Sequence, residues 1–164
     1  MMRPTASDVL AALRQKGFGL ATAESCTGGM IGAALTAIPG SSDTYRGGVI
    51  SYTNQVKQQL LGVPKEILEQ YGAVSAPVAQ AMALGAAKAL SAEAAVATTG
   101  LAGPSGDEFG NPVGTVYIAC ALKGKVKVVH CLFHGDRRQI RQAATEKALE
   151  LILSTVKQQF PQEN

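Results

Sequence analysis

The sequence has no tryptophan, few other aromatic residues and little net charge. Of its 164 residues, 5% are aromatic, and 15 Lys+Arg against 12 Asp+Glu leave a formal net charge of +3. Nucleic-acid-binding domains combine a basic surface with stacking aromatics, so this composition argues against a nucleic-acid partner. A hydrophobic fraction of 46% with so little net charge also excludes intrinsic disorder. We expect one domain over residues 1–164, large enough to bury its own core.

The sequence also lacks an even set of cysteines and any long hydrophobic run. Cys26, Cys120 and Cys131 form no CxxC pair, so neither a disulfide framework nor a zinc ribbon is predicted. On a continuous strand, His130 and His134 would lie about 13 Å apart, at ~3.3 Å per residue, which is too far to share a metal ion unless the strand ends first. No run of 18 apolar residues is present, and the N-terminus lacks the apolar core of a secretory signal. We therefore expect no metal site, no membrane contact and a cytoplasmic protein with free thiols.

Hydrophobic periodicity and Gly/Pro punctuation predict alternating helices and strands. Helices are predicted over residues 5–16, 30–38, 54–61, 64–71, 76–90 and from 136 towards the C-terminus, and strands over 18–23, 46–52, 94–98, 113–122 and 126–133. The last two strands read as a hairpin. This order predicts an α/β fold, a single-domain three-layer sandwich in which a mixed β-sheet has helices on both faces.

A polar turn with the sequence ESCTGG, residues 24–29, joins the first predicted strand to the second helix. Backbone N–H groups at a helix N-terminus can stabilise an oxyanion, and a hydroxyl in the turn is placed to act as a nucleophile. The plainer interpretation is that Ser25 and Thr27 cap the helix, and both roles can coexist. Cys26 competes as a nucleophile, but both histidines lie far along the chain, so a buried thiol without a catalytic role is favoured.

A lysine is the base that this sequence offers to a catalytic serine. There is no GxSxG motif and no readable Ser–His–Asp arrangement, whereas Ser–Lys pairs are a known variant. The lysine must then lose its proton through burial or a neighbouring cation. Lys57 lies about one helical turn past the predicted strand 46–52, at a sheet edge where active sites collect. The alternative is a solvated surface lysine.

Two further segments are candidates for binding an anion. The run TGLAGPSG, residues 99–106, follows a buried strand, and its backbone N–H groups could approach a phosphate or carboxylate, although an ordinary turn explains it equally well. Arg137 and Arg141 share a helix face at i, i+4 and could hold a phosphate. The alternative is a solvated first turn capped by Asp136. Arginine at a helix N-terminus opposes the helix dipole, which favours a functional role for at least one of them.

Seven blocks in order resemble one family. They are TAESCTGG (22–29), PGSS (39–42), RGGVISYTNQVK (46–57), GAVS (72–75), TTGLAGPSG (98–106), PVGTVYIA (112–119) and GDRRQIR (135–141). Together they resemble the CinA C-terminal-domain family, the nicotinamide-nucleotide amidases. The resemblance extends over nearly the whole chain, from about residue 7 to residue 160, and the order and spacing of the blocks make it more specific than any single block.

The resemblance implies an activity and a site. The family hydrolyses the carboxamide of nicotinamide mononucleotide (NMN) to nicotinate mononucleotide and ammonia, without a metal or other cofactor. It implies that Ser25 is the nucleophile, that Lys57 is the general base, and that Tyr52 supports this pair or contacts the substrate. The substrate contacts that we expect are Glu24, Thr27, Gly28, Thr99, Gly100, Gly103, Arg137 and Arg141. It also implies a homo-oligomer acting on this small molecule in the cytoplasm.

Two questions stay open at this point. The same fold, glycine loop and arginine cluster would serve a non-catalytic nucleotide-binding module, and the two readings differ in whether Lys57 reaches Ser25. The residue that contacts the pyridine ring is also unassigned. Four aromatic residues could stack on it, although each is more often a core residue: Phe18, Tyr45, Phe109 and Tyr117.

Overall fold

A five-stranded mixed sheet forms the middle layer of the structure, a computed structural model that describes residues 4–161. Its strands are β1 (Leu20–Glu24), β2 (Tyr45–Ile50), β3 (Ala94–Gly100), β4 (Thr115–Leu122) and β5 (Lys125–Leu132). They lie in the order β2-β1-β3-β4-β5, with β2, β1 and β3 parallel and the β4–β5 hairpin antiparallel. Residues 1–3 and 162–164 of the expected domain lie outside the described residues.

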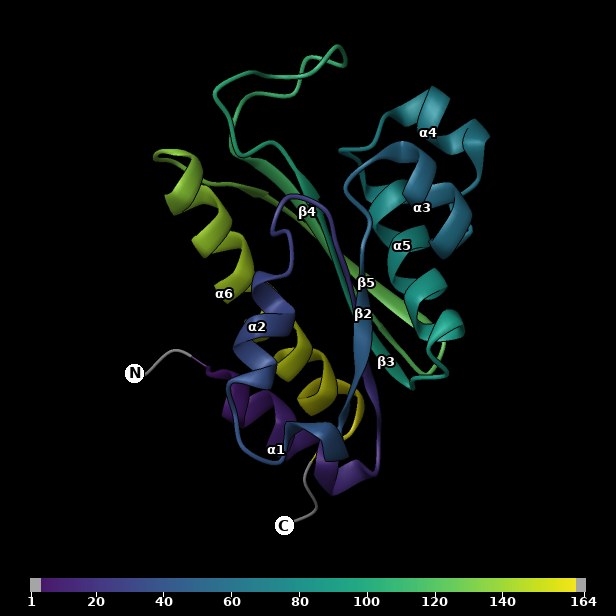
Figure 1. The fold of residues 1–164 in the computed structure, drawn as a ribbon, viewed down its shortest axis with the longest axis vertical. Helices are drawn as coiled ribbons and strands as arrows, with labels where there is room; N and C mark the ends of the chain where they lie inside the picture. Colours follow the sequence, from purple (N-terminus) through teal and green to yellow (C-terminus); the bar gives the residue numbers. More distant parts are fainter. Residues whose placement is uncertain (1–3, 162–164) are drawn as a thin grey trace.

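Helices cover both faces of this sheet (Figure 1). One face carries α1 (Ala6–Lys16), α2 (Met30–Thr36) and α6 (Arg137–Gln159), and the other carries α3 (Asn54–Leu61), α4 (Lys65–Tyr71) and α5 (Ala76–Ala89). The predicted α/β class, with a mixed sheet between two helical layers, is confirmed. One element was missed, a 3-10 helix at Ser41–Asp43 within a stretch predicted only as a helix-ending turn.

The two sheet faces carry side chains of different size. The buried apolar residues of β3 and β4 that face α5 are alanines, whereas those facing α6 are mostly larger, such as Val96 and Ile118. Small side chains let α5 approach the sheet closely, as close packing of a protein interior requires. On the far side of α5, Gly85 lies so near the carbonyl oxygen of Leu61 that any Cβ would collide with it. The C-terminal end of α3 is thereby held against α5.

Local signals at helix ends explain why most boundaries were predictable. Thr5 caps α1 in a capping box with Asp8, and Asp136 caps α6 in the same way with Gln139. Strand ends moved by a few residues, for example β2, which ends at Ile50 and not at residue 52. The chain leaves the edge there to begin α3, which Thr53 caps by accepting the N–H of Val56.

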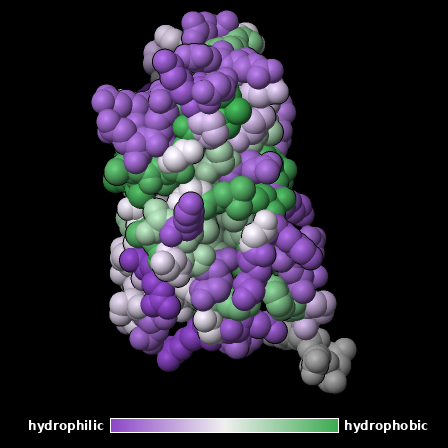
Figure 2. Space-filling model, turned by 90° about the vertical axis from the view of Figure 1, so that its right-hand side faces the viewer, coloured by the Kyte–Doolittle hydropathy of each residue, from purple (hydrophilic) through white to green (hydrophobic). Residues whose placement is uncertain are grey.

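Large apolar side chains remain exposed on the surface. Figure 2, seen from the side that carries α3, α4 and α5, shows hydrophobic residues in a band across an otherwise hydrophilic face. Among the described residues, the exposed large apolar ones are Ile50, Tyr52, Leu60, Tyr71, Leu84, Phe109 and Leu132. Such side chains are what a subunit interface buries, and the homo-oligomer stays a prediction. Within residues 4–161, none of the helices has the length and apolar character needed to cross a bilayer.

Candidate active site

Three parallel strands bring their carboxyl ends to one edge of the sheet, and the candidate residues follow those ends. The N–H of Ser25 donates to the carbonyl of Thr98 (3.0 Å), and the N–H of Ser51 donates to the carbonyl of Glu24 (2.8 Å). These bonds extend the strand ladders by one residue past β1 and β2. The turn after β1 and the turn after β2 are therefore fixed side by side, at the edge where open α/β sheets bind ligands.

Ser25 and Lys57 meet at this edge. The Lys57 Nζ donates a hydrogen bond to the Ser25 Oγ at 3.0 Å and a second to the Ser51 carbonyl at 2.8 Å. Lys57 is 1% exposed and Ser25 is 7% exposed. The solvated lysine considered from the sequence is therefore wrong. Lys57 lies in the first turn of α3 and reaches back under the end of β2, and the Ser51 carbonyl fixes the direction of its amine.

Burial lowers the pKa of Lys57 from 10.5 to about 8, because the interior disfavours an ammonium ion, while the nearby Cys26 acts weakly in the opposite direction. In the part of the chain that the structure describes, no carboxylate forms an ion pair with Lys57. At pH 7 about a tenth of the amine is therefore uncharged, compared with almost none of an exposed lysine. Its lone pair then lies 3.0 Å from a hydroxyl. Burial also raises the pKa of the Cys26 thiol to about 11, which keeps it protonated.

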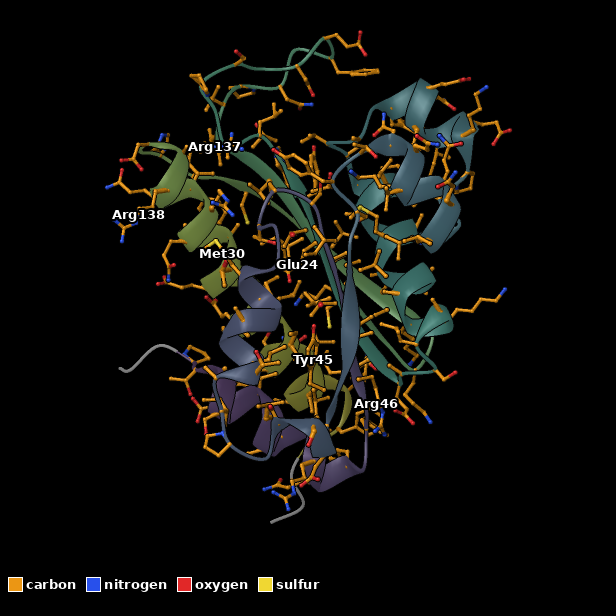
Figure 3. All side chains as sticks on the ribbon, in the orientation of Figure 1. Glu24, Met30, Tyr45, Arg46, Arg137 and Arg138 are labelled. Atoms are coloured by element: carbon orange, nitrogen blue, oxygen red, sulfur yellow. The ribbon has the colours of Figure 1, made fainter. Side chains whose placement is uncertain are left out.

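Glu24, and not Ser25 or Thr27, satisfies the N-terminus of α2. Its buried carboxylate accepts hydrogen bonds from the hydroxyl of Thr27 (2.7 Å) and from the N–H groups of Ile31 (2.8 Å) and Gly32 (3.1 Å). Figure 3 shows Glu24 in the interior, between α2 and the sheet. The interpretation that Ser25 and Thr27 cap the helix is thus wrong, because the N-cap residue of α2 is Gly29, which has no side chain to cap it. The Ser25 hydroxyl is left to face Lys57.

Thr27 and Arg141 hold the rest of the turn. The fully buried Thr27 hydroxyl also bonds the hydroxyl of Thr98 (2.8 Å). Arg141 donates from Nε to the carbonyl of Cys26 (3.0 Å) and from Nη2 to that of Thr27 (3.3 Å). A Cβ on Gly28 would lie 3.2 Å from that Nη2, where φ is +57°, so the turn favours glycine there. The substrate contacts expected for Glu24, Thr27, Gly28 and Arg141 stay predictions that this geometry does not favour.

Two cavities open beside the Ser25–Lys57 pair. The serine cavity, about 430 Å³, is lined by Ser25, Lys57, Thr99 and segments 72–74 and 107–109. The arginine cavity, about 330 Å³, is lined by Cys26, Arg137 and segment 100–105. Tyr52, Gly100 and Leu101 belong to both walls. The hydroxyl of Thr99 donates to the carbonyl of Ala73 (2.8 Å), which ties the end of β3 to the segment before α5.

Arg137 is the arginine of its cluster that faces this site. It donates from Nη1 to the carbonyl of Gly103 (2.6 Å) and from Nη2 to the hydroxyl of Tyr52 (3.1 Å). Arg138 projects from α6 away from the sheet (Figure 3). The structure therefore brings Ser25, Lys57, Tyr52, Thr99, Gly100, Gly103 and Arg137 together around the two cavities.

Only one of the four aromatic candidates lines a cavity beside Ser25. Phe18 packs edge-on against Phe160 at the far end of α6, and Tyr117 stacks on His130. Tyr45 bonds the hydroxyl of Thr22. Phe109 lies on the serine cavity and is 45% exposed. The sequence analysis missed the role of the Ser51 carbonyl, because any residue type can supply a backbone acceptor and the sequence therefore gives no sign of it.

Comparison with known proteins places this chain in a family. Residues 2–156 match the family described as the CinA C-terminal domain. A CinA-like protein of Gemmatimonas aurantiaca is 51% identical over 131 residues, which are 80% of this chain and 31% of that protein. A putative competence-damage inducible protein of Clostridium beijerinckii is 44% identical over 140 residues, 85% of this chain and 34% of that protein. The chain thus spans about a third of the length of these curated relatives.

Solved structures agree with this match. A competence-damaged protein (CinA) superfamily protein from Klebsiella pneumoniae superposes with a TM-score of 0.91 at 34% identity, covering 93% of this chain and 96% of that one. The competence/damage inducible protein CihA from Agrobacterium tumefaciens gives a TM-score of 0.87 at 40% identity, covering 91% and 92%. Sequence and fold agree along nearly the whole length, so the chain belongs to the CinA C-terminal domain family.

Proposed function

We propose that the protein is an amidohydrolase that converts NMN to nicotinate mononucleotide and ammonia, with Ser25 as nucleophile and Lys57 as general base. The observation that carries the proposal is the 3.0 Å contact between the Lys57 Nζ and the Ser25 Oγ, made by a lysine that is 1% exposed. Amide hydrolysis near pH 7 needs an activated nucleophile, a site for the oxyanion and a proton for the leaving nitrogen.

The first half of the reaction forms an ester on Ser25. Neutral Lys57 takes the hydroxyl proton while the Ser25 Oγ attacks the carboxamide carbon, and the carbonyl electrons move onto oxygen. The N–H of Gly28 is already bonded to the Ser25 carbonyl (3.1 Å), whereas the N–H groups of Cys26 and Thr27 donate to no backbone carbonyl among residues 4–161. These two groups are placed to hold the oxyanion. The C–N bond then breaks as the Lys57 ammonium returns the proton to the leaving ammonia.

The second half releases the acid. Lys57, neutral again, takes a proton from water while the water oxygen attacks the ester carbon. The ester C–O bond breaks, Lys57 returns that proton to the Ser25 Oγ, and the nicotinate leaves as a carboxylate after losing its acidic proton to solvent. The Ser51 carbonyl keeps the amine aimed at Ser25 through both proton transfers.

The second cavity supplies a place for the phosphate. Arg137 lies on its wall beside the glycine-containing segment 100–105, and a guanidinium is suited to a phosphate. The two cavities share Tyr52, so a ligand with a carboxamide at one end and a phosphate at the other could occupy both. Arg137 is therefore our candidate for the phosphate contact, in preference to Arg141.

A non-catalytic nucleotide-binding module remains the other candidate function. It shares the arginine cavity and predicts a solvated Lys57 far from Ser25. The buried contact between these two side chains favours the enzyme.

An ammonia-release assay with purified protein, NMN and a chelator tests the proposal. We expect wild-type protein to release ammonia in the presence of the chelator, and Ser25→Ala to bind NMN without turnover. Ser42→Ala, which removes an exposed hydroxyl at the opposite edge of the sheet, is the matched control and should behave as wild type. Nicotinamide riboside, which lacks the phosphate, should be a poorer substrate. Wild-type ammonia release by Ser25→Ala would refute the assignment.

A further inference from the structure

Phe109 is an apolar ring that the fold leaves uncovered on the wall of the serine cavity. It is 45% exposed and lies on the connection between β3 and β4, which rises above the carboxyl edge of the sheet in Figure 1. Its ring packs against the backbone at Gly72, where a Cβ would come within 2.6 Å of it. Gly72 thus has two roles: its φ of +77° suits the turn, and its lack of a Cβ leaves room for the Phe109 ring.

The surrounding connection is braced to keep Phe109 there. The Asp107 Oδ1 accepts the N–H groups of Phe109 (3.1 Å) and Asn111 (2.9 Å), and the Asp107 Oδ2 accepts the Asn111 Nδ2 (2.8 Å). The Asn111 Nδ2 also donates to the carbonyl of Val74 (3.3 Å), another residue of the cavity wall. These bonds tie the connection to the segment before α5. The ring is therefore held on the cavity wall by several contacts that do not depend on a ligand.

The two cavities differ in charge. Asp107 and Glu108 line the serine cavity together with Lys57, so two carboxylates on its wall stand against one amine. Arg137 is the charged residue on the wall of the arginine cavity. These charges favour one orientation of a ligand that carries both a cation and an anion, with the cationic group in the serine cavity and the anionic group beside Arg137. Aromatic faces attract cations as carboxylates do, and Tyr52 and Phe109 supply such faces.

We infer that the serine cavity selects a carboxamide carried on a positively charged aromatic ring, with Phe109 as the stacking face and Glu108 as the carboxylate that faces the charge. This inference rests on the proposed function, whose substrate carries that charge on the ring nitrogen bonded to ribose. It extends the function by making ring charge, and not the carboxamide alone, a determinant of specificity. A neutral aromatic amide on the same ribose phosphate would then bind more weakly.

The test compares two ligands that differ in one ring atom. NMN has a cationic ring, and benzamide mononucleotide, a C-nucleotide with a neutral benzamide ring, keeps the same carboxamide, ribose and phosphate. Binding is measured by calorimetry in a Ser25→Ala background, so that the electrophilicity of the two amides plays no part. We expect NMN to bind at least about fivefold more tightly, within the range of a partly desolvated cation–π contact.

Second-site variants then assign the preference to residues. Glu108→Gln should weaken NMN about threefold and leave the neutral analogue unchanged, because it removes charge but not shape. Phe109→Leu should weaken NMN about fivefold and the analogue less, and Phe109→Tyr should restore NMN binding. Glu66→Gln removes an exposed carboxylate of α4 away from the cavity and is the matched control, with no change expected.

The outcomes separate the two ideas. Equal affinity of the Ser25→Ala protein for both ligands would overturn the inference, as would a Glu108→Gln variant that weakens both ligands alike. Failure of wild-type protein to release ammonia from NMN would overturn the proposed function instead. The binding preference could then still be measured, and it would stand or fall by the same comparison.

Discussion

Replacing Lys57 with methionine tests how the burial of this lysine affects both the catalytic rate and the stability of the fold. The buried environment lowers the pKa of Lys57 from 10.5 to about 8. At pH 7, roughly a tenth of a group with a pKa of 8 is neutral, compared with about one part in 3,000 for a pKa of 10.5. The site thus holds some 300-fold more of the base form than a surface lysine would. Methionine has a similar length but cannot accept a proton, so we expect ammonia release to fall by about 10³-fold.

The same substitution should make the protein more stable. Each pH unit of pKa depression corresponds to about 1.4 kcal/mol, so burying this lysine lowers the free energy of unfolding at pH 7 by about 3 kcal/mol. Methionine removes that cost but leaves the Ser25 hydroxyl and the Ser51 carbonyl without their donor, at about 1–2 kcal/mol. We expect a net gain of about 1–2 kcal/mol at pH 7.

The gain should depend on pH in a defined direction. Between pH 8 and 10.5 the unfolded chain keeps the Lys57 proton while the folded protein loses it. The unfolded state therefore binds more protons, and wild-type stability rises with pH through this window, whereas the methionine variant lacks this contribution. Urea unfolding at pH 7 and pH 10 measures the difference. A variant less stable than wild type at pH 7, or an advantage that does not shrink at pH 10, would refute the reasoning, as would ammonia release within tenfold of wild type.

Four further outcomes are expected. The kcat/KM for NMN should rise with pH to a plateau with a midpoint near 8, as Lys57 loses its proton, and a flat profile from pH 6 to 9 would contradict its role as base. Arg137→Gln should raise the KM for NMN about 10- to 100-fold while leaving nicotinamide riboside unaffected, and equal losses for both would argue against a phosphate contact. Glu24→Gln should lower the free energy of unfolding by about 2 kcal/mol in urea titrations, because the buried carboxylate accepts three hydrogen bonds, and unchanged stability would show that an amide serves equally well. Gly85→Ala should destabilise the protein by about 1–3 kcal/mol, since the new methyl meets the Leu61 carbonyl, and a calorimetric midpoint equal to that of wild type would show that α5 can shift without cost.

Much of the fold could be predicted from the sequence, because residues within or next to each helix and strand determine where it forms. Strand and helix periods, the Thr5 and Asp136 caps and the glycine stops all act within a few residues. The convergence of Ser25 and the base at one sheet edge follows from parallel strands, once the strands are ordered. Its position after the strand 46–52 made Lys57 the leading lysine, but the same pattern fits a solvated helix residue, and the family resemblance supplied its role as the base.

The hydrogen-bond partners of the buried polar groups could not be predicted from the sequence. Whether Ser25, Thr27 or Glu24 serves the N–H groups of α2 depends on a turn geometry that all three residue types tolerate. Arg141 has the helix position expected of a phosphate ligand, yet its guanidinium reaches two turn carbonyls, because α6 passes beside the turn. Such choices are fixed by how separate elements pack.

The proton-transfer pair and the residues proposed to contact the ring lie on different parts of the fold. Ser25 and Ser51, whose carbonyl holds the Lys57 amine, are hydrogen-bonded to the central strands β3 and β1, whereas Phe109 and Glu108 belong to a connection outside the sheet. Sequence drift in that connection can retune which ring is accepted without disturbing the proton-transfer pair beneath it. Relatives that share the pair could thus diverge in their preferred amides, and directed evolution of new specificities is best begun at Glu108 and Phe109, because Asp107 holds the connection in place.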